Sequence, residues 1–442
     1  MTVDRLARRL DRLPAEMQTL QPRPNRGRLV RAVGTVLRAV LPDVRLGELC
    51  RIQACRAGPL LAEVVGFDGD EAVLAPLGEV MGLNAGAEVE ATGDVLRVPV
   101  GPALLGRVLD GLGRPLDTSQ HGPLKATSYR PVLASPPPAL DRQRVERPLP
   151  LGVRVIDGLL TCGEGQRVGI YGEPGVGKST LLASLIRGAN VDIVVVALVG
   201  ERGREVRDFL ERGIAAEMRA RTVTVVATSD RSAIERLKAS LTATAIAEAF
   251  RDAGLRVLLV LDSVTRFARA LREVGLAAGE PPARRGFPPS VAAELPRLLE
   301  RAGPGPIGSI TAFYTVLVEG DGNSDPVAEE TRAILDGHII LSPQLAASGH
   351  YPAIDVLTSR SRVMDAVVEP AHRDRATAVR ALLHHHSEIE FLVKVGEYRP
   401  GTDPRSDAAL AGIDAVRAFL RQEATELSKW EETLTWLSRL PT

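Results

Sequence analysis

The sequence predicts an α/β protein in which a central parallel β-sheet, covered by helices on both faces, lies between a small N-terminal β-barrel and a C-terminal helical domain. Short β-rich runs separated by turn residues fill the first hundred residues, which is typical of a small barrel. Beyond residue 150, continuous apolar runs of strand length alternate with helical segments, which favours a parallel sheet buried on both faces. After residue 370 the apolar residues recur at helical spacing.

The composition excludes several classes of protein. The 442 residues include 55 basic and 55 acidic side chains, so the formal charge of 55 − 55 = 0 argues against binding nucleic acid by bulk charge. Aromatic residues make up only 3%, which leaves few surfaces for stacking bases. Cys50, Cys55 and Cys162 have neither paired spacing nor an even count, so we expect a reducing, cytoplasmic setting.

Residues 1–26 form a predicted amphipathic segment. Leu6, Leu10 and Leu13 recur at helical spacing with arginines among them, and charges interrupt every apolar stretch, so no secretory signal is expected. The segment either docks on a partner, stays solvated, or contacts a membrane surface, and we favour the first two.

Residues 27–100 carry the predicted barrel strands, with Asp68-Gly69 as a hairpin signal between two of them. Residues 101–150 are rich in Pro and Gly and include three consecutive prolines, 136–138, so we expect an extended connector and a domain boundary. The central α/β domain then covers residues 151–368 and the helical domain residues 369–442.

The central domain contains apolar runs of strand length that alternate with helix formers. A short run at 168–171 enters a Gly-rich turn, and residues 181–186 continue from that turn as a helix. A long helix is predicted over 232–253. Further strands are expected at 193–199, 223–227 and 257–261.

The Gly-rich turn fits the pattern G-x-x-x-x-G-K-[ST], and it lies between a predicted strand and a predicted helix as that motif requires. Glycines let the backbone amides curl around phosphate oxygens, and the helix N-terminus adds its dipole. Lys178 would reach the β- and γ-phosphates, while the Ser179 hydroxyl would coordinate magnesium. The predicted nucleotide-binding residues are Gly172, Glu173, Pro174, Gly175, Val176, Gly177, Lys178, Ser179 and Thr180.

Two carboxylates follow predicted strands. Asp262 ends the strand 257–261, in the Walker B position from which a carboxylate holds magnesium through water. Glu201 follows the strand 193–199 at the carboxyl end, where ligands bind in such sheets, and is a candidate general base. The alternative for Glu201 is a structural salt bridge to Arg202 or Arg204.

Several separate motifs resemble the rotary ATPase catalytic-subunit superfamily: the phosphate loop, GERGREV, LDSVTRFARALREV and DGHIILSPQLAASGHYPAIDVLTSRSRVM. Within it, FPPSVAAELPRLLERAG, TVLVEGDG and VGEYRPGTDP most resemble the type III secretion ATPases of injectisomes and flagella. This resemblance covers nearly the whole chain. It implies a homohexameric ring, an N-terminal β-barrel, a RecA-like domain that binds ATP and Mg²⁺, and a C-terminal helical domain.

The resemblance also implies roles for individual residues. Lys178 and Ser179 match the phosphate and magnesium contacts, Glu201 the catalytic carboxylate, and Asp262 the Walker B residue. Arg202 matches the adjoining arginine of the family motif.

Two further residues match family positions outside the phosphate loop. Tyr351 matches the aromatic residue that stacks on adenine, an interaction that any purine ring satisfies. Arg362 matches the arginine finger that a neighbouring subunit supplies to the transferred phosphoryl group. Arg360, on the same side of an extended strand, is the competing candidate.

The function implied is an ATP-hydrolysing ring motor that releases export substrates from chaperones and unfolds them, peripherally at the cytoplasmic face of the bacterial inner membrane. Expected partners are a central stalk protein at the C-terminal domain, a stator near the N-terminus, and substrates with their chaperones, but no nucleic acid. A Rho-like nucleic-acid motor is the rival, against which the neutral charge counts. A non-enzymatic nucleotide-binding subunit is a third reading. Residues 404–440 look more like an injectisome member than a flagellar one.

Overall fold

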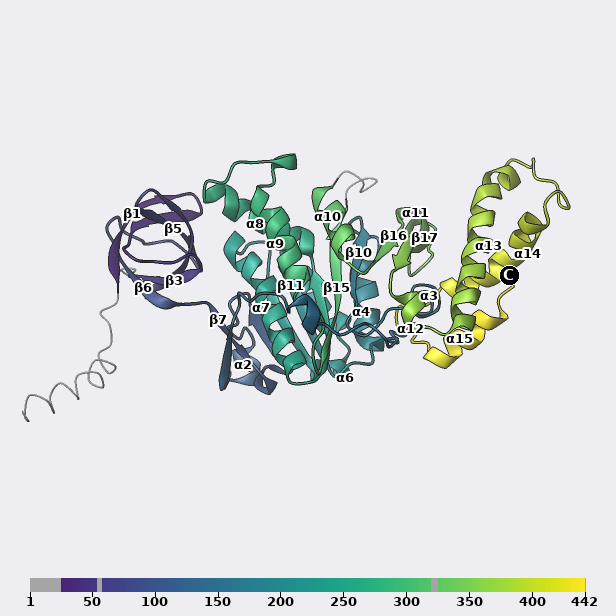
Figure 1. Ribbon diagram of the computed structural model, residues 1–442, viewed down its shortest axis with the longest axis horizontal. Helices are drawn as coiled ribbons and strands as arrows, with labels where there is room; N and C mark the ends of the chain where they lie inside the picture. Colours follow the sequence, from purple (N-terminus) through teal and green to yellow (C-terminus); the bar gives the residue numbers. More distant parts are fainter. Residues whose placement is uncertain (1–24, 54–57, 319–324, 442) are drawn as a thin grey trace, which may run out of the picture. The chain divides into compact units, whose positions relative to one another are not determined.

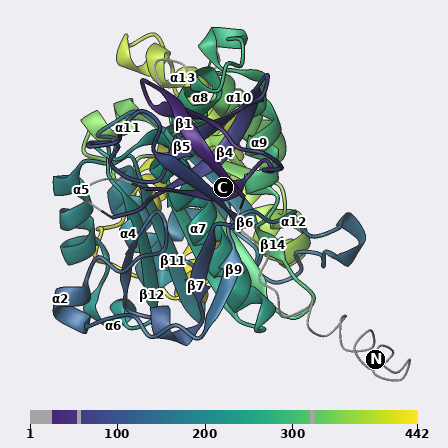
Figure 2. The same cartoon turned by 90° about the vertical axis from the view of Figure 1, so that its left-hand side faces the viewer.

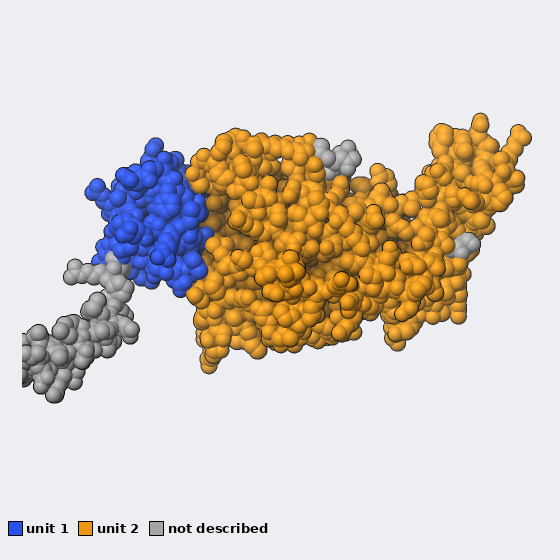
Figure 3. All heavy atoms as spheres, in the orientation of Figure 1, with its two compact units in different colours: residues 1–95 blue, residues 96–442 orange. Residues whose placement is uncertain are grey.

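The computed structural model describes residues 25–53, 58–318 and 325–441. Its contacts divide the chain into two compact units, Met1–Val95 and Leu96–Thr442, which Figure 3 colours separately. The predicted amphipathic segment, apart from its last two residues, and Cys55 lie outside the described residues. Across the described ranges, no helix combines the length and the apolar character needed to cross a membrane.

The first unit contains the predicted closed barrel of antiparallel strands, in the order β1-β2-β5-β4-β3-β6, with β1 pairing back to β6. Leu37, Ile52 and Leu74 are among the side chains that fill its interior. The predicted hairpin signal joins β4 to β5, and Gly69 there has a φ of 60°, a conformation that favours glycine. The strands are β1 (Arg26–Val33), β2 (Val36–Val40), β3 (Glu48–Ile52), β4 (Leu60–Asp68), β5 (Glu71–Pro76) and β6 (Glu88–Val95).

The second unit is built on one large sheet with the order β17-β16-β10-β15-β13-β11-β12-β8 (Figures 1 and 2). The strands from β16 to β8 pair in parallel, as predicted, while β17 and the short β14 pair antiparallel at β16 and β15. The strands are β8 (Val108–Asp110), β10 (Arg167–Gly172), β11 (Ile193–Val199), β12 (Thr222–Ala227), β13 (Arg256–Asp262), β14 (Gly303–Pro304), β15 (Ser309–Leu317), β16 (Gly337–Leu341) and β17 (Ile354–Ser361).

Helices pack on both faces of this sheet. Leu258 and Val260 of β13 join a core cluster with Leu182 and Leu185 of α4, so their alternate neighbours face the other way. Helix α7 contacts β11, β12 and β13, and α8 lies against α7, α9 and β15. The helices of this region are α4 (Lys178–Gly188), α5 (Gly203–Asp208), α6 (Ala216–Arg219), α7 (Ala233–Asp252), α8 (Val264–Ala277), α9 (Pro289–Leu299), α10 (Pro326–Ile334), α11 (Pro343–Ala347) and α12 (Met364–Val367).

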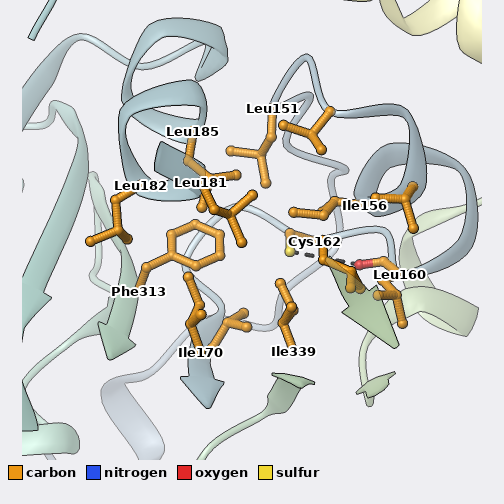
Figure 4. Packing of buried hydrophobic residues seen from close by; sticks show 14 of the residues in the cluster. Leu151, Ile156, Leu160, Cys162, Ile170, Leu181, Leu182, Leu185, Phe313 and Ile339 are labelled. Carbon is orange, nitrogen blue, oxygen red and sulfur yellow. Dashed lines mark hydrogen bonds between the residues drawn. The ribbon is translucent and has the colours of Figure 1, made fainter. Parts of the chain in front are cut away.

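The core beneath α4 fixes the helix that follows the phosphate loop. Figure 4 shows Leu181 and Leu185 of α4 packed with Phe313 and Ile170, which come from neighbouring strands. All four side chains are at most 4% exposed. The start of α4 is therefore held in place by apolar packing that is independent of any ligand.

The stretch 101–150 differs from the extended connector that its composition predicts. Val108 and Leu109 belong to β8, which extends the sheet beside β12. A second strand, β9 (Ser128–Pro131), pairs with β7 (Arg97–Val100), and α2 (Thr118–His121) lies between β8 and β9. Asp117 secures this edge by accepting hydrogen bonds from the Arg107 guanidinium and the Val108 amide. Local composition misses β8 because pairing with β12 stabilises it.

The predicted C-terminal helical domain is confirmed. Helices α13, α14 and α15 pack on one another and on α3 (Arg154–Leu159), which precedes the phosphate-loop strand. Val379, Val416 and Phe419 share the core cluster that also contains α4. The three helices are α13 (Pro370–Lys394), α14 (Pro404–Leu420) and α15 (Trp430–Arg439).

A buried ion pair ties α7 to the end of α9. The Arg301 guanidinium donates to both carboxylate oxygens of Glu248 at 2.8 Å and to the Val132 carbonyl at 2.8 Å, and both charged side chains are about 2% exposed. We expect Arg301→Met to lower the stability of the second unit by about 3 kcal/mol, because the buried Glu248 carboxylate loses both hydrogen bonds from Arg301 and keeps the more distant Arg130 guanidinium, 3.9 Å away. Thermal unfolding followed by circular dichroism measures the loss.

Exchanging both members of this pair provides the control. Arg301→Met combined with Glu248→Met removes the two charges together, so the double variant should be more stable than Arg301→Met alone. A double variant that unfolds at a lower temperature than the single one would contradict this account of the pair.

Candidate active site

The phosphate loop joins β10 to α4 at the carboxyl edge of the sheet. Gly175 and Gly177 have φ angles of 87° and 95°, which favour glycine, and Gly177 caps α4. Lys178 is only 8% exposed, and its ammonium donates to the carbonyls of Gly172 at 2.8 Å and Glu173 at 2.5 Å. The loop thus curls around the ammonium group.

Asp262 and Glu201 lie at the ends of two adjacent strands. Strand β11 pairs with β13 so that Leu198 is opposite Asp262, and Glu201 follows three residues later. Both carboxylates line one hollow together with Ser179, which we call the catalytic hollow. Asp262 is 7% exposed and accepts a hydrogen bond of 2.6 Å from the Thr315 hydroxyl on β15.

Burial and neighbouring charges shift the pKa values of Glu201, Asp262 and Lys178. Burial raises the pKa of Glu201 to about 7, and the nearby Asp262 charge raises it as well. Burial also raises the pKa of Asp262, against the opposing effects of Thr315 and Lys178. Burial lowers the pKa of Lys178, which the two carboxylates counteract. A carboxylate with a pKa near neutrality suits proton transfer at physiological pH.

Glu201 forms an ion pair, but its partner differs from the two arginines that the sequence suggests. Its carboxylate lies 3.8 Å from the Arg266 guanidinium on the first turn of α8, rather than pairing with Arg202 or Arg204. The positive charge of Arg266 lowers the pKa of Glu201. Sequence reasoning missed Arg266, although a cation in the first turn of a helix opposes the helix dipole and so signals another role.

Arg202 is not among the residues that line the catalytic hollow. Its side chain is 81% exposed and pairs with Glu205 at 3.7 Å. Arg204 pairs with Asp208 at 3.9 Å and is likewise exposed. The partners Glu205 and Asp208 also line the hollow, so in this structure the two arginines pair with carboxylates at its border and not with Glu201 or Asp262.

Tyr351 lies against the phosphate loop. A Cβ atom placed on Gly177 would be 3.5 Å from the Tyr351 ring, and the side chain is 45% exposed. The ring lines a second hollow with Leu341, which we call the base hollow. Thr180 lines both the base hollow and the catalytic hollow, so the two meet at the start of α4.

Arg362 lies outside both hollows. It follows β17, its amide donates to the Asp336 carbonyl at 2.9 Å, and its guanidinium donates to the Arg332 carbonyl at 3.0 Å. It lines a separate pocket with Arg360 and Arg380. Within one chain, the structure therefore does not bring either candidate arginine finger to Glu201.

The oxygen donors of the catalytic hollow fit a magnesium ion. Ser179 supplies a hydroxyl and Asp262 a carboxylate, both ligands that this hard cation prefers. The described part of the chain contains no group of three His, Cys, Asp or Glu side chains able to hold a metal by themselves. An ion here would complete its shell with waters and phosphate oxygens, as Mg²⁺ commonly does.

Three family models match the chain. The ATP synthase alpha/beta family matches through its beta-barrel domain at residues 29–93 and its nucleotide-binding domain at residues 152–361. The T3SS EscN ATPase C-terminal domain matches residues 368–439. Together these matches span the barrel, the large sheet and the C-terminal helices.

Individual relatives match over nearly the whole chain. The type 3 secretion system ATPase of Sinorhizobium fredii is 60% identical over 94% of this chain and 92% of its own. The flagellum-specific ATP synthase of Salmonella typhimurium is 48% identical over 96% and 95%. Of these two relatives, the secretion system ATPase is the more similar in sequence to this chain.

Solved structures agree with the fold. The assembled ATPase EscN from the enteropathogenic Escherichia coli type III secretion system has a TM-score of 0.89 and 48% identity, covering 93% of this chain and 98% of its own. EscN in complex with its central stalk EscO has a TM-score of 0.86 and 47% identity over the same shares. The chain therefore belongs to the type 3 secretion system ATPases of the ATP synthase alpha/beta family, and it is an ATPase.

Proposed function

We propose that this ATPase works as a homohexameric ring in which each active site is completed by the neighbouring subunit. The observation that carries the proposal is the separation of Arg362 from the catalytic hollow of its own chain. An exposed arginine at the edge of one protomer is available to the site of the next. The assembled state of EscN supports the ring form.

The phosphate loop and magnesium would bind the triphosphate. The backbone N–H groups of residues 172–180, apart from Pro174, would surround the phosphates, and the Lys178 ammonium would exchange its two loop carbonyls for phosphate oxygens. Ser179 and Asp262, which both line the catalytic hollow, would hold Mg²⁺, Ser179 through its hydroxyl and Asp262 through a water. The bound ion supplies positive charge that neutralises the developing negative charge on the phosphates.

Glu201 would act as the general base. Its carboxylate would accept a proton from the attacking water, while the Arg266 guanidinium, 3.8 Å away, holds the carboxylate in place. Arg202 would also take part in catalysis. To do so, its side chain would have to break its ion pair with Glu205 and turn toward the catalytic hollow. Tyr351 would stack on the adenine ring in the base hollow.

Arg362 would stabilise the transition state of the adjoining site. The transferred phosphoryl group spreads negative charge over its equatorial oxygens, and a guanidinium from outside contributes roughly 10³–10⁵ in rate in other phosphoryl-transfer enzymes. Arg360 remains the alternative finger because it lines the same pocket. Hydrolysis would therefore depend on ring assembly.

The coupled process would be protein export at the cytoplasmic face of the bacterial inner membrane, with release of substrates from chaperones and their unfolding. A central stalk protein would bind at the C-terminal helices; the complex of EscN with its central stalk EscO supports a partner of this kind. A stator protein would bind near the N-terminus. We propose the domain bounds 1–26, 27–100, 101–150, 151–368 and 369–442 for this molecule, and we propose no nucleic-acid partner.

Mixing two inactive variants tests the shared site. Lys178→Ala removes the phosphate contact and Arg362→Ala the finger, so each pure ring should lose most of its activity. In a ring formed from an equal mixture, about a quarter of the interfaces join an intact hollow to an intact finger, because 1/2 × 1/2 = 1/4. The steady-state rate of phosphate release should therefore recover to about a quarter of the wild-type rate.

The mixture must be assembled from separated subunits, with each pure variant as its control. If mixing restores no activity while the rings assemble, or if pure Arg362→Ala hydrolyses ATP at the normal rate, Arg362 does not act across the interface. Recovery in a mixture with Arg360→Ala in place of Arg362→Ala, when Arg362→Ala gives none, would assign the role to Arg360.

The raised pKa of Glu201 predicts the pH dependence of hydrolysis. A carboxylate with a pKa of about 7 keeps its proton below that pH and cannot act as a base, so kcat/KM for Mg-ATP should fall as the pH drops below about 7. Arg266→Met removes the charge that lowers this pKa, so the midpoint of the profile should move to higher pH. A midpoint that is unchanged or lower in this variant would contradict the assignment.

A further inference from the structure

One segment of the C-terminal region forms a wall of the base hollow. Residues 421–428, which we call the base strap, connect α14 to α15. Gln422 and Glu426 line the base hollow together with Tyr351. Ala424 lines both the base hollow and the catalytic hollow. The position of this strap therefore sets the width of the base hollow.

Hydrogen bonds fasten the strap to the nucleotide-binding elements. The Ala424 carbonyl accepts from the Ser184 hydroxyl at 3.0 Å and from the Arg187 guanidinium at 2.9 Å, both on α4. The Gln422 amide donates to the Tyr351 carbonyl at 2.9 Å. The strap is thus connected to the helix of the phosphate loop and to the backbone of Tyr351, the residue whose ring is expected to stack on the base.

Arg154, the first residue of α3, makes the densest set of contacts to the strap. Its guanidinium donates to the carbonyls of Phe419, at 3.1 Å, and Arg421, and it pairs with the Glu426 carboxylate. Its backbone amide donates to the Gln422 side-chain oxygen at 2.8 Å. The Arg154 side chain is 4% exposed, so water competes little for its bonds to the two carbonyls. The Glu426 side chain is 43% exposed, so that end of the ion pair remains in contact with water.

Contacts with neighbouring residues hold Arg154 in place. Its guanidinium carbon lies 4.7 Å from the centre of the Trp436 ring on α15. The Asp157 carboxylate accepts from the amides of Leu151 and Gly152 at 2.9 Å each, which fixes the chain just before α3. The Gly152 carbonyl in turn accepts from the Gln422 side chain at 2.7 Å.

We propose that Arg154 is a positioning residue for the nucleotide base: by fixing both ends of the strap it sets the affinity of the site for the base of the nucleotide. Arg154 itself does not line either hollow, so it acts through Gln422 and Glu426. This inference depends on the proposed placement of the base beside Tyr351. The Lys178 ammonium donates to the carbonyls of Gly172 and Glu173 inside the phosphate loop, not to the strap.

Separate measurements on the base and on the phosphates test the proposal. Arg154→Met keeps most of the apolar stem but removes the donors, so the Kd of Mg-ADP measured by calorimetry should rise about tenfold or more, as expected for losing buried hydrogen bonds to a charged group. The Kd of Mg-pyrophosphate, which has no base, should stay within about twofold. In steady-state kinetics KM for ATP should rise more than kcat falls.

A matched control separates positioning from general stability. His372 is 8% exposed and binds the Gly158 carbonyl from α13 at 2.8 Å, so it ties the same helix α3 to the C-terminal helices without touching the strap. His372→Leu should lower the melting temperature but leave the Kd of Mg-ADP unchanged. If both variants weaken ADP equally, or if Arg154→Met weakens pyrophosphate as much as ADP, Arg154 has no special role.

Two further measurements keep the test decisive. Tyr351→Ala should weaken ADP but not pyrophosphate; if it weakens neither, the proposed base site is wrong, whatever Arg154 does. Hydrogen exchange on the wild-type protein needs no variant to fold: Mg-ADP should protect the amides of residues 421–428, and Mg-pyrophosphate should not. Equal protection by both ligands would overturn the proposal.

Discussion

The active site depends on the burial of a positive charge beside two negative ones. The Lys178 ammonium is only 8% exposed, and two backbone carbonyls and the carboxylates of Glu201 and Asp262 compensate for its loss of water. Removing any one of these charged side chains would leave the remaining buried charges without full compensation in a region of low dielectric constant. The apolar cluster beneath α4 holds these groups together before any nucleotide arrives.

The residues proposed to bind and hydrolyse ATP come from three different parts of the chain. Lys178, Glu201 and Asp262 converge because they follow β10, β11 and β13 at one edge of a parallel sheet. Arg362 follows β17, an antiparallel strand at the opposite end of the strand order from β8, and lines another pocket. The base strap comes from the C-terminal helices, so nucleotide binding and the position of α14 and α15 are physically connected.

Local sequence patterns predict the catalytic centre but not the residues that surround it. The glycine motif and the apolar strands 193–199 and 257–261 are local signals, and each leads to a candidate residue that the structure places at the sheet edge. Thr315 was missed because β15 was not recognised, although its β-branched and aromatic residues indicate a strand. Arg154 and Gln422 are separated by 268 residues, so only tertiary packing reveals their contact.

The most direct test of the account is the turnover of Glu201→Gln. The amide keeps the size of the side chain and cannot accept the proton of the attacking water, so Mg-ATP should still bind while the steady-state rate falls by about 10²–10⁴. Equilibrium binding and phosphate release measured on the same preparation separate the two effects. A variant that binds ATP and releases phosphate at the wild-type rate would contradict the central claim that this buried carboxylate is the base.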